Sequence, residues 1–142
     1  MHTLKYTTTI DGAILPEHAL DGDVGIDLTA LKLVKKYGEK TFMYDTGICI
    51  QPPPGYYTEI VPRSSIIKTG YIQSNSIGIL DPAYTGSIRV VLTKVDDSLP
   101  DLEPPFRVSQ LLLRKANEVS PVFVASLDDT VRGDRGFGST NQ

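Results

Sequence analysis

"SIRVVLTKV", residues 87–95, is the stretch that decides the fold class of this chain. Ile88, Val90 and Leu92 fall on one face of an extended backbone, and the residues between them fall on the opposite face. This period of two residues is typical of a β-strand with at least one continuous buried side. The stretch therefore predicts a strand that contributes to the core of a β-sheet.

The rest of the chain is built from similar short apolar segments that are bounded by turn residues. Helical periodicity is nearly absent, and the prolines within 51–55 and 99–105 leave no room for a long helix. We therefore expect a single all-β domain, a sandwich or a barrel. The other expected strand segments are "LKYTTTI" (4–10), "VGIDLTA" (24–30), "KTFMYDTGICI" (40–50), "GYYTEIVP" (55–62), "YIQSNSIGIL" (71–80), "FRVSQLLLRK" (106–115) and "PVFVASL" (121–127).

Length and cysteine content indicate a soluble domain that folds without a disulfide. A chain of 142 residues is long enough for one domain with its own core. Its one cysteine, Cys49, lies in the apolar run "GICI" and is expected to be a buried structural thiol in a reducing compartment. The N-terminal stretch lacks the pattern of a secretory signal, and no apolar run approaches the length of a membrane span. We expect a cytoplasmic protein, in the host cytoplasm if the chain is viral or phage-encoded.

Charge and histidine content argue against two classes of partner. The formal net charge is −3, whereas binding to nucleic acid depends on many Lys and Arg contacts with phosphates. A small anionic ligand needs only a few local cations. His2 and His18 are far apart and neither belongs to a ligand-spaced cluster, so no structural His/Cys metal site is expected.

The stretch "PRSSIIKTG" (62–70) follows a predicted strand and is suited to binding an anion. Arg63 carries a planar fork of donors that matches phosphate oxygens, and Ser64 and Ser65 add hydroxyls where a short helical turn can begin. The structural alternative is an N-capped turn with a surface arginine. On these residues alone, both interpretations stay open.

The stretch "GILDPAYTG" (78–86) places Asp81 between a strand end and a proline. A hairpin there can hold a carboxylate beside a pocket, as a general base requires, while Tyr84 offers a flat apolar face. The same residues can equally form a purely structural turn, with Pro82 setting the bend and Gly86 allowing positive φ.

Two further stretches carry polar groups in unusual settings. Gln110, in "RVSQLLL" (107–113), lies on the same apolar strand face as Val108 and Leu112. Its amide therefore either bridges core groups or faces a pocket. The C-terminal "RGDRGFGST" (132–140) combines glycines, arginines and hydroxyls around one aromatic residue. It is either a solvated terminus or an arm that binds an anion with backbone N–H groups and Arg132.

Taken in order, five motifs of this chain resemble those of the trimeric dUTPases, the dUTP nucleotidohydrolases. The resemblance covers nearly the whole chain, and it also relates the glycine-rich C-terminus to an arm that closes over bound nucleotide in that family. The motifs are "DGDVGIDLTA" (21–30), "PRSSI" (62–66), "NSIGILDPAYTG" (75–86), "RVSQLLL" (107–113) and "RGDRGFGST" (132–140).

The resemblance implies an all-β jelly-roll (β-clip) subunit, a homotrimer, and active sites at subunit boundaries. Residues 1–130 would form the β domain and residues 131–142 a mobile glycine-rich arm of the same domain. The implied reaction is the hydrolysis of dUTP to dUMP and pyrophosphate, which keeps uracil out of DNA and supplies dUMP for dTTP synthesis. The implied cofactor is Mg²⁺, held mainly by the substrate phosphates, with Asp27 and Gln110 in the surrounding water network.

The same resemblance implies a role for each matched position. Asp81 would activate a water for attack on the α-phosphorus, and Tyr84 would lie against the deoxyribose and exclude a 2′-hydroxyl. The implied uracil pocket is formed by Asn75, Gly78, Ile79 and Leu80. The implied phosphate-binding residues are Arg63, Ser64, Ser65, Arg132, Ser139 and Thr140, with Phe137 stacked on the base and Gly138 giving a backbone donor.

The chain departs from the family pattern in two places. "PPFRVSQL" (104–111) lacks the Gly-Asp turn that commonly precedes the arginine of the fourth motif. Arg135 stands where a glycine is usual, and Asn141 where another is common. Arg135 is either an extra cation for the phosphates or a side chain that points to solvent, and a lost glycine narrows the freedom of the arm.

Two other functions are alternatives to the hydrolysis of dUTP. The related dCTP deaminases require an acidic residue on the strand after the hairpin, about where Val91 stands in this apolar strand. The alternative from another class is a dUTPase-like binding module that recruits a regulatory protein partner. A partner-binding site on the outer surface of such a module has no recognisable sequence motif.

Overall fold

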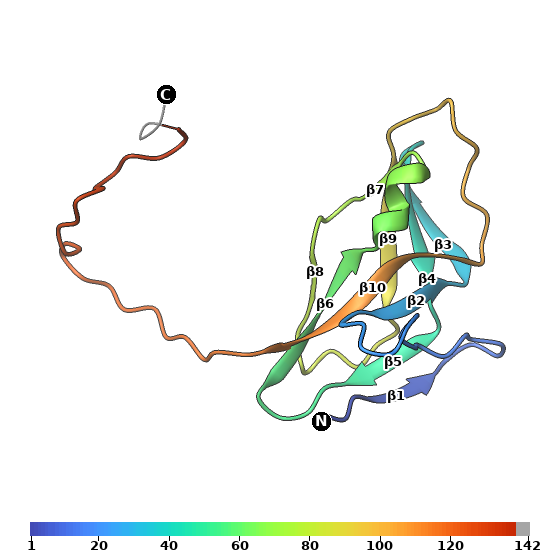
Figure 1. Cartoon of the computed structure of the whole chain (residues 1–142), viewed down its shortest axis with the longest axis horizontal. Coiled ribbons are helices and arrows are strands. Elements are labelled where there is room, and N and C mark those ends of the chain that lie inside the picture. Colours follow the sequence, from blue (N-terminus) through green and yellow to red (C-terminus); the bar gives the residue numbers. More distant parts are fainter. Residues whose placement is uncertain (139–142) are drawn as a thin grey trace.

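The computed structural model describes residues 1–138 and shows an all-β jelly-roll domain followed by an extended C-terminal tail (Figure 1). One short 3₁₀ helix, η1 (Ser64–Lys68), follows the sixth strand, where the sequence predicted a helical turn. The strands of the described residues are β1 (Lys5–Thr8), β2 (Ile26–Ala30), β3 (Lys32–Tyr37), β4 (Thr41–Asp45), β5 (Ile48–Gln51), β6 (Tyr56–Pro62), β7 (Tyr71–Gln73), β8 (Gly78–Leu80), β9 (Arg89–Lys94) and β10 (Phe106–Lys115).

The strands form two four-stranded sheets and one two-stranded sheet. The first large sheet has the order β2-β10-β6-β8, the second has the order β3-β4-β9-β7, and β1 pairs with β5. All of these pairs are antiparallel. From β6 to β10 each successive strand belongs to the other large sheet, so segments that are distant in sequence lie side by side.

The core lies between the sheets in two groups of buried side chains. The alternation of 87–95 is confirmed, because Ile88, Val90 and Leu92 are each at most 2 % exposed. Cys49 is buried, as predicted. One group is Ala30, Tyr44, Ile66, Tyr71, Val90, Leu92 and Val108, and the other is Leu28, Ile48, Ile50, Ile60, Ile88 and Leu111.

Two of the predicted strand segments are divided by turns. The segment 40–50 breaks at Thr46 and Gly47, because Gly47 has a φ of 70° and its N–H is capped by the Asp45 carboxylate at 2.8 Å. The segment 71–80 breaks at 74–77, where Ser76 has a φ of 59°. The structure also has β3, which was not predicted: its six residues, KLVKKY, include three lysines, do not alternate between apolar and polar, and are all exposed.

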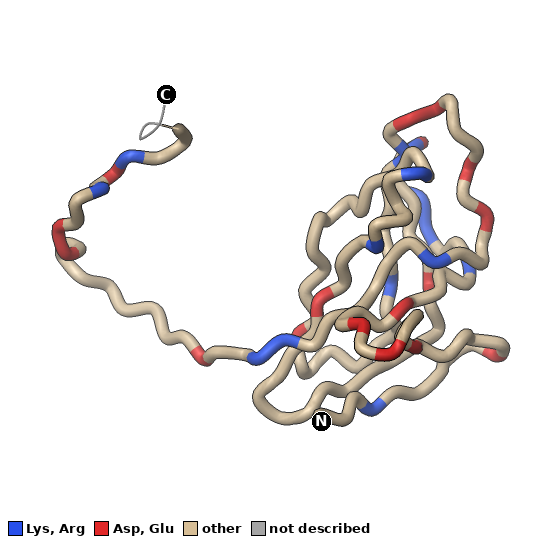
Figure 2. Tube along the Cα trace, viewed as in Figure 1, with Lys and Arg blue, Asp and Glu red and all other residues tan. Residues whose placement is uncertain are grey.

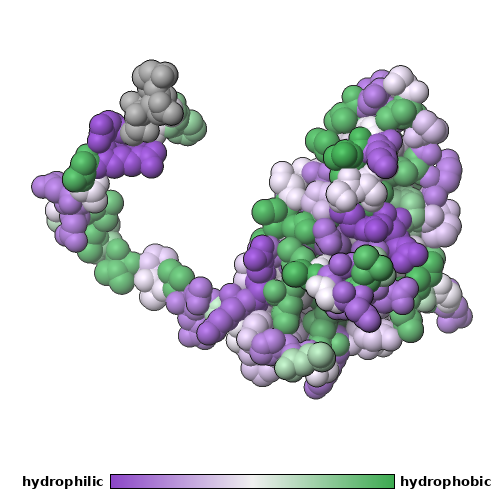
Figure 3. Space-filling view, viewed as in Figure 1, coloured by the Kyte–Doolittle hydropathy of each residue, from purple (hydrophilic) through white to green (hydrophobic). Residues whose placement is uncertain are grey.

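The predicted strand at 121–127 is wrong for a single chain. Residues 116–138 contain no strand, and Figure 1 shows this segment leaving the domain as a long tail. Its apolar side chains have no partner strand to cover them, and Phe123 is 95 % exposed. Basic residues mark both ends of the tail and acidic residues lie between them (Figure 2), while Figure 3 shows its apolar residues in solvent. The domain boundary at residue 130 stays a prediction.

Within residues 1–138, none of the helical structure is long and apolar enough to cross a membrane.

Candidate active site

The first group of predicted site residues is Asp27, Arg63, Ser64 and Gln110, which we call the Asp27 cluster. An ion pair between Asp27 and Arg63 lies at its centre. Asp27 lies on β2 and is only 6 % exposed, and Arg63 follows β6 directly. The Arg63 Nε lies 3.0 Å from Asp27 Oδ1, and Arg63 Nη1 donates a hydrogen bond to the carbonyl of Arg107 at 3.0 Å. A charge-assisted bond and a second bond to the backbone hold the guanidinium in one orientation.

Gln110 joins this cluster through strand register. On β10 it lies opposite Asp27 of β2 and opposite Val61 of β6, and its Nε2 donates to the carbonyl of Pro62 at 3.2 Å. A Cβ at Gly25 would lie 1.8 Å from Gln110 Oε1, so this position requires a glycine while the amide keeps its place. Gln110 therefore faces the Asp27 cluster, not the core.

Two open cavities border the cluster. Arg63 and Asp27 line both of them. The first, of about 400 Å³, is lined by Glu17, His18, Ala19, Asp27, Arg63 and Arg107. The second, of about 460 Å³, is lined by Ala19, Asp23, Val24, Gly25, Asp27, Arg63, Ser64, Gln110 and Leu112. These cavities offer a guanidinium, a hydroxyl and an amide to one ligand, a donor set suited to phosphate oxygens.

The second cluster lies around the turn that joins β7 of one large sheet to β8 of the other. Gln73, at the end of β7, is buried, and its Nε2 donates to the carbonyls of Ile60 at 2.9 Å and Ser76 at 3.1 Å. These two bonds fasten the turn to β6. Gln73 carries no signal of this role in the sequence, because its partners are set by the pairing of distant strands.

The backbone of Gly78, Ile79 and Leu80 forms β8, the edge strand of its sheet. Gly78 pairs with Ile60, and Leu80 pairs with Thr58. The Asn75 Nδ2 lies 3.2 Å from where a Cβ of Gly78 would be, so the amide folds against this strand. An edge strand presents backbone donors and acceptors on its outer side, and these can hydrogen-bond to a flat polar ring.

Asp81 and Tyr84 follow β8 on one exposed turn. The Tyr84 N–H donates to the carbonyl of Asp81 at 3.0 Å, and the Tyr84 hydroxyl donates to the carbonyl of Ser87 at 2.8 Å. A Cβ at Gly86 would come within 2.7 Å of the Tyr84 hydroxyl oxygen, so the ring lies closely over this glycine. The carboxylate and the ring are thus presented together at the surface.

The tail contains a compact turn that is closed by its two arginines. Arg132 Nε donates to the carbonyl of Arg135 at 2.6 Å, and Arg135 Nε donates to the carbonyl of Arg132 at 3.0 Å. Arg135 also bonds the carbonyl of Val131 at 2.8 Å. Its side chain therefore stabilises the turn, and Phe137 lies just beyond it, fully exposed with a φ of 49°. Gly138 has a φ of 82°, and Ser139 and Thr140 lie outside the described residues.

The structure therefore places the predicted site residues in three groups. Asp27, Arg63, Ser64 and Gln110 come together around the two cavities. Ser65 follows them in η1, where its Oγ is buried and has no partner among the described residues. The residues of β8 and of the turns on either side of it border the other side of β6, and the tail residues lie away from the domain (Figure 1). A single chain does not bring the tail group to the other two.

Within residues 1–138, no group of three or more His, Cys, Asp or Glu side chains could hold a metal ion. The carboxylate of Asp27 already pairs with Arg63 at 3.0 Å. These donors do not fit an ion held by protein ligands alone. They do fit an ion that is held by phosphates and touches Asp27 through water.

Another carboxylate, that of Glu59, lies on the same face of the β2-β10-β6-β8 sheet as Asp27 and Gln110. Glu59 is opposite Leu112 and Ile79, and it accepts bonds from Arg114 Nε at 3.0 Å and from the Tyr57 hydroxyl at 2.9 Å. These hydrogen bonds, that of Arg114 first, lower the pKa of Glu59 from its ordinary value. The bond to Glu59 in turn raises the pKa of Tyr57.

The comparisons with known proteins agree with the motifs. The family model described as dUTPase matches residues 11–141. Two curated relatives are deoxyuridine 5'-triphosphate nucleotidohydrolases. The one from Clostridioides difficile is 30 % identical and covers 99 % of both chains. The one from Leifsonia xyli subsp. xyli is 36 % identical and covers 94 % of this chain and 92 % of its own.

Solved structures show the same fold. The dUTPase of Staphylococcus bacteriophage 80alpha, solved with dUPNHPP, superposes with a TM-score of 0.80 at 19 % identity, covering 99 % of both chains. A native EIAV dUTPase superposes with a TM-score of 0.64 at 25 % identity, covering 88 % of this chain and 100 % of its own.

Proposed function

This chain belongs to the dUTPase family and is a dUTP diphosphatase, and from its site we propose how it hydrolyses dUTP to dUMP and pyrophosphate. One observation carries the proposal. The edge strand β8 leads directly into the turn that presents Asp81 and Tyr84 together. A surface that can bind a base edge is thus joined by a few residues to a carboxylate and a ring that can act on the attached sugar and phosphate.

The uracil ring would bind along the outer edge of β8. Backbone groups of Gly78, Ile79 and Leu80 would pair with its polar edge, and the amide of Asn75 would close the end of the pocket. A narrow pocket of this kind rejects the methyl group of thymine by bulk. It rejects cytosine because the exocyclic amino group would face a backbone donor.

Asp81 would act as the general base that takes a proton from the attacking water. Its carboxylate lies on the surface immediately after β8, so it can reach a phosphate attached to a nucleoside held there. Tyr84, three residues later and bonded to the Asp81 carbonyl, would lie against the deoxyribose. A ring in that position leaves no room for a 2′-hydroxyl, and so it would exclude UTP.

The phosphates would bind to the Asp27 cluster. Arg63, oriented by its two bonds, would bind phosphate oxygens, Ser64 would lie near the oxygen that leaves the α-phosphorus, and Ser65 would add a further donor. Asp27 and Gln110 would order the waters around the triphosphate. Bound Mg²⁺ would supply positive charge that neutralises the pyrophosphate leaving group.

The tail would complete the site. Phe137 is fully exposed, so its ring is available to stack on the base, and Gly138 would donate from its backbone. Arg132, together with Ser139 and Thr140, would bind the γ-phosphate end. The turn closed by Arg135 supports this role, because it presents the arginine and the aromatic residue within a short span.

The assembly that would unite these groups is a homotrimer. Apolar side chains along the tail are exposed in the single chain, which supports a tail that packs on another subunit. Such an enzyme, acting in the cytoplasm, would keep uracil out of DNA and supply dUMP for dTTP synthesis.

The experiment is pyrophosphate release in the presence of Mg²⁺, with dUTP, dCTP, dTTP and UTP assayed in parallel and products separated by chromatography. We expect release from dUTP alone, with dUMP as the other product. The Asp81→Asn variant should lose turnover and keep nucleotide binding. Conversion of dCTP to a uracil nucleotide would contradict the proposal in favour of deamination, and inactivity with all four would favour a binding role.

A further inference from the structure

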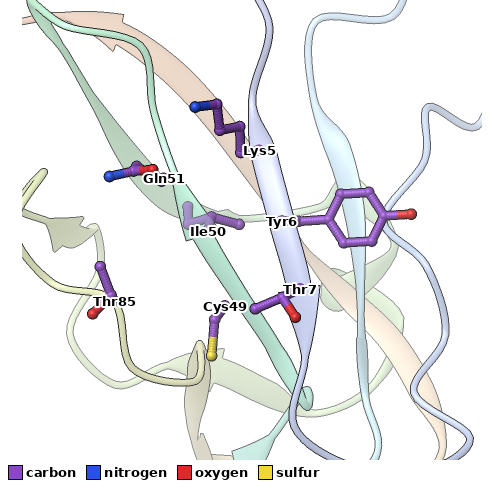
Figure 4. Close-up of a pocket in the computed structure, with 7 residues that line it drawn as sticks. All are labelled: Lys5, Tyr6, Thr7, Cys49, Ile50, Gln51 and Thr85. Atoms are coloured by element: carbon purple, nitrogen blue, oxygen red, sulfur yellow. The ribbon is translucent and has the colours of Figure 1, made fainter.

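The loop of residues 81–87, between β8 and β9, has little packing of its own. Its residues from 81 to 86 are all exposed. An open cavity of about 250 Å³ lies between Thr85 and the β1–β5 edge, and Figure 4 shows Thr85 apart from Cys49 and Ile50. A second cavity, of about 480 Å³, is lined by Pro82 and residues 51–55, with Thr3 and Lys5. Open cavities thus lie between this side of the loop and the residues of β1, β5 and 52–55.

The two ends of the loop are fixed to different sheets. Leu80 pairs with Thr58 of β6 at the start. At the other end Ile88 is fully buried, its N–H donates to the carbonyl of Ile48 at 2.7 Å, and its carbonyl accepts from Thr46. Between these ends, the backbone of residues 81–87 belongs to no strand pair.

One side-chain hydrogen bond ties this loop to the rest of the domain among residues 1–138. The Ser87 hydroxyl donates to Asp45 Oδ1, which also accepts from the Gly47 N–H at 2.8 Å. Asp45 ends β4, is only 7 % exposed, and has Arg89 of β9 opposite it in register with Nε 3.9 Å from Oδ2. A buried carboxylate with these three partners is a fixed anchor point.

The anchor continues into the proposed site through hydrogen bonds. The carbonyl of Ser87 accepts from the Tyr84 hydroxyl at 2.8 Å, and the Tyr84 N–H donates to the carbonyl of Asp81 at 3.0 Å. Asp45 thus connects, through Ser87 and Tyr84, to the turn that carries the proposed general base. Neither Asp45 nor Ser87 belongs to the groups proposed to touch dUTP.

We infer that Asp45 is a positioning residue for Asp81 and Tyr84, and that it acts through the hydroxyl of Ser87; this inference rests on the proposed function. With the contact in place, the carboxylate and the ring keep one geometry relative to β8. Without it, the loop samples more positions. Because misplacement of a reacting group costs rate more than binding, kcat for dUTP falls more than KM rises. Because the Tyr84 ring moves, discrimination against UTP also falls.

The chain offers closely matched variants for the test. Ser87→Ala removes the contact and leaves Asp45 with Gly47 and Arg89, whereas Ser87→Thr keeps a hydroxyl. Asp45→Ala removes every side-chain contact of Asp45, whereas Asp45→Asn keeps an oxygen that accepts from both Ser87 and Gly47. The control is Thr41→Val, which removes the 2.8 Å hydroxyl contact with Thr93 between the same two strands, away from the loop.

For Ser87→Ala and Asp45→Ala we expect kcat for dUTP to fall about tenfold or more, and the dUTP-to-UTP ratio of kcat/KM to fall by a similar factor. Ser87→Thr and Asp45→Asn should recover most of the loss, and Thr41→Val should change neither quantity. The double variant Ser87→Ala/Asp45→Ala should lose no more kcat than the single variant with the larger loss, because both substitutions break the same Asp45–Ser87 hydrogen bond. Values of kcat and of the ratio that stay within about twofold of wild type in Ser87→Ala would overturn the inference.

Amide hydrogen exchange of residues 81–88 separates this inference from the proposed function. Faster exchange there in Ser87→Ala, but not in Thr41→Val, confirms the anchor even if the wild-type chain does not hydrolyse dUTP. In that case the proposed function fails and the anchor stands. If exchange of residues 81–88 is unchanged in Ser87→Ala and the wild-type chain hydrolyses dUTP, the positioning role of Asp45 is contradicted and the proposed function is not. If Asp45→Ala does not fold, Ser87→Ala and Ser87→Thr still decide the question.

Discussion

Arg63 Nε lies 3.0 Å from Asp27 Oδ1, and this one contact joins the end of β6 to the edge strand β2. It leaves the arginine partly exposed at the rim of two cavities while its carboxylate partner is almost fully buried. Asp27 and the Arg107 carbonyl thus hold the guanidinium in place, while its remaining N–H groups are available to a ligand in the cavities.

Arg63→Lys should weaken dUTP binding and leave the fold intact. Lysine keeps the charge but lacks the planar fork in which Nε bonds Asp27 and Nη1 bonds the Arg107 carbonyl while other N–H groups stay available for a phosphate. We expect KM for dUTP to rise about tenfold and inhibition by inorganic pyrophosphate to weaken in parallel. Arg114→Lys, on the same sheet but paired with Glu59, is the control. Equal kinetics in the two variants would contradict the assigned role of Arg63.

Gly25→Ala should reduce activity without a large loss of stability. The new Cβ would displace the end of the flexible Gln110 side chain, whose Oε1 lies 1.8 Å from that position. The amide would then leave the Asp27 cluster, and we expect kcat/KM to fall about tenfold. In the background of Gln110→Ala the same change should cost almost nothing, because there is no amide left to displace. Additive losses in this double-mutant cycle would show that Gly25 acts by another route.

Gln73→Leu should loosen the turn that joins β7 to β8. The change leaves the carbonyls of Ile60 and Ser76 without their shared donor inside the protein. We expect a loss of about 1–3 kcal/mol in the free energy of unfolding, measured by urea titration, and a higher KM for dUTP. Gln51→Leu, at the exposed end of β5, should change neither. A Gln73→Leu variant with wild-type stability would contradict the claim that the Gln73 hydrogen bonds hold this turn to β6.

The pH dependence of stability should include a contribution from Glu59. Its folded-state pKa is lowered by the hydrogen bonds from Arg114 and Tyr57, so the charged form is favoured by folding. The stabilisation is fully present above the ordinary glutamate pKa of about 4.3 and is lost as the pH falls through the lower folded-state value.

The measurement is the difference in unfolding free energy between wild type and Glu59→Gln, followed from pH 7 downward. We expect the difference to be largest at neutral pH and to shrink in acid. A difference that stays constant or grows as the pH falls has the opposite sign and contradicts the lowered pKa.

The sequence by itself determined the features that depend on local pattern. The alternation at 88–92 predicted a buried strand face, and Asp81 follows a strand end as the stretch "GILDPAYTG" indicated. The motif order also identified Asp27, Arg63 and Gln110, which the fold brings together. The prediction of a strand at 121–127 was wrong, because alternation shows that a segment can pair and does not supply a partner.

Only the tertiary structure decided which distant residues support the site. Asp45 and Ser87 are 42 positions apart, and Gln73 bonds a carbonyl 13 positions away. These contacts arise because β4 pairs with β9, and because the turn after β7 crosses to the other sheet, where β8 pairs with β6. An isolated Asp or Gln in a strand carries no sign of its partner, since the partner is chosen by the long-range register of antiparallel strands.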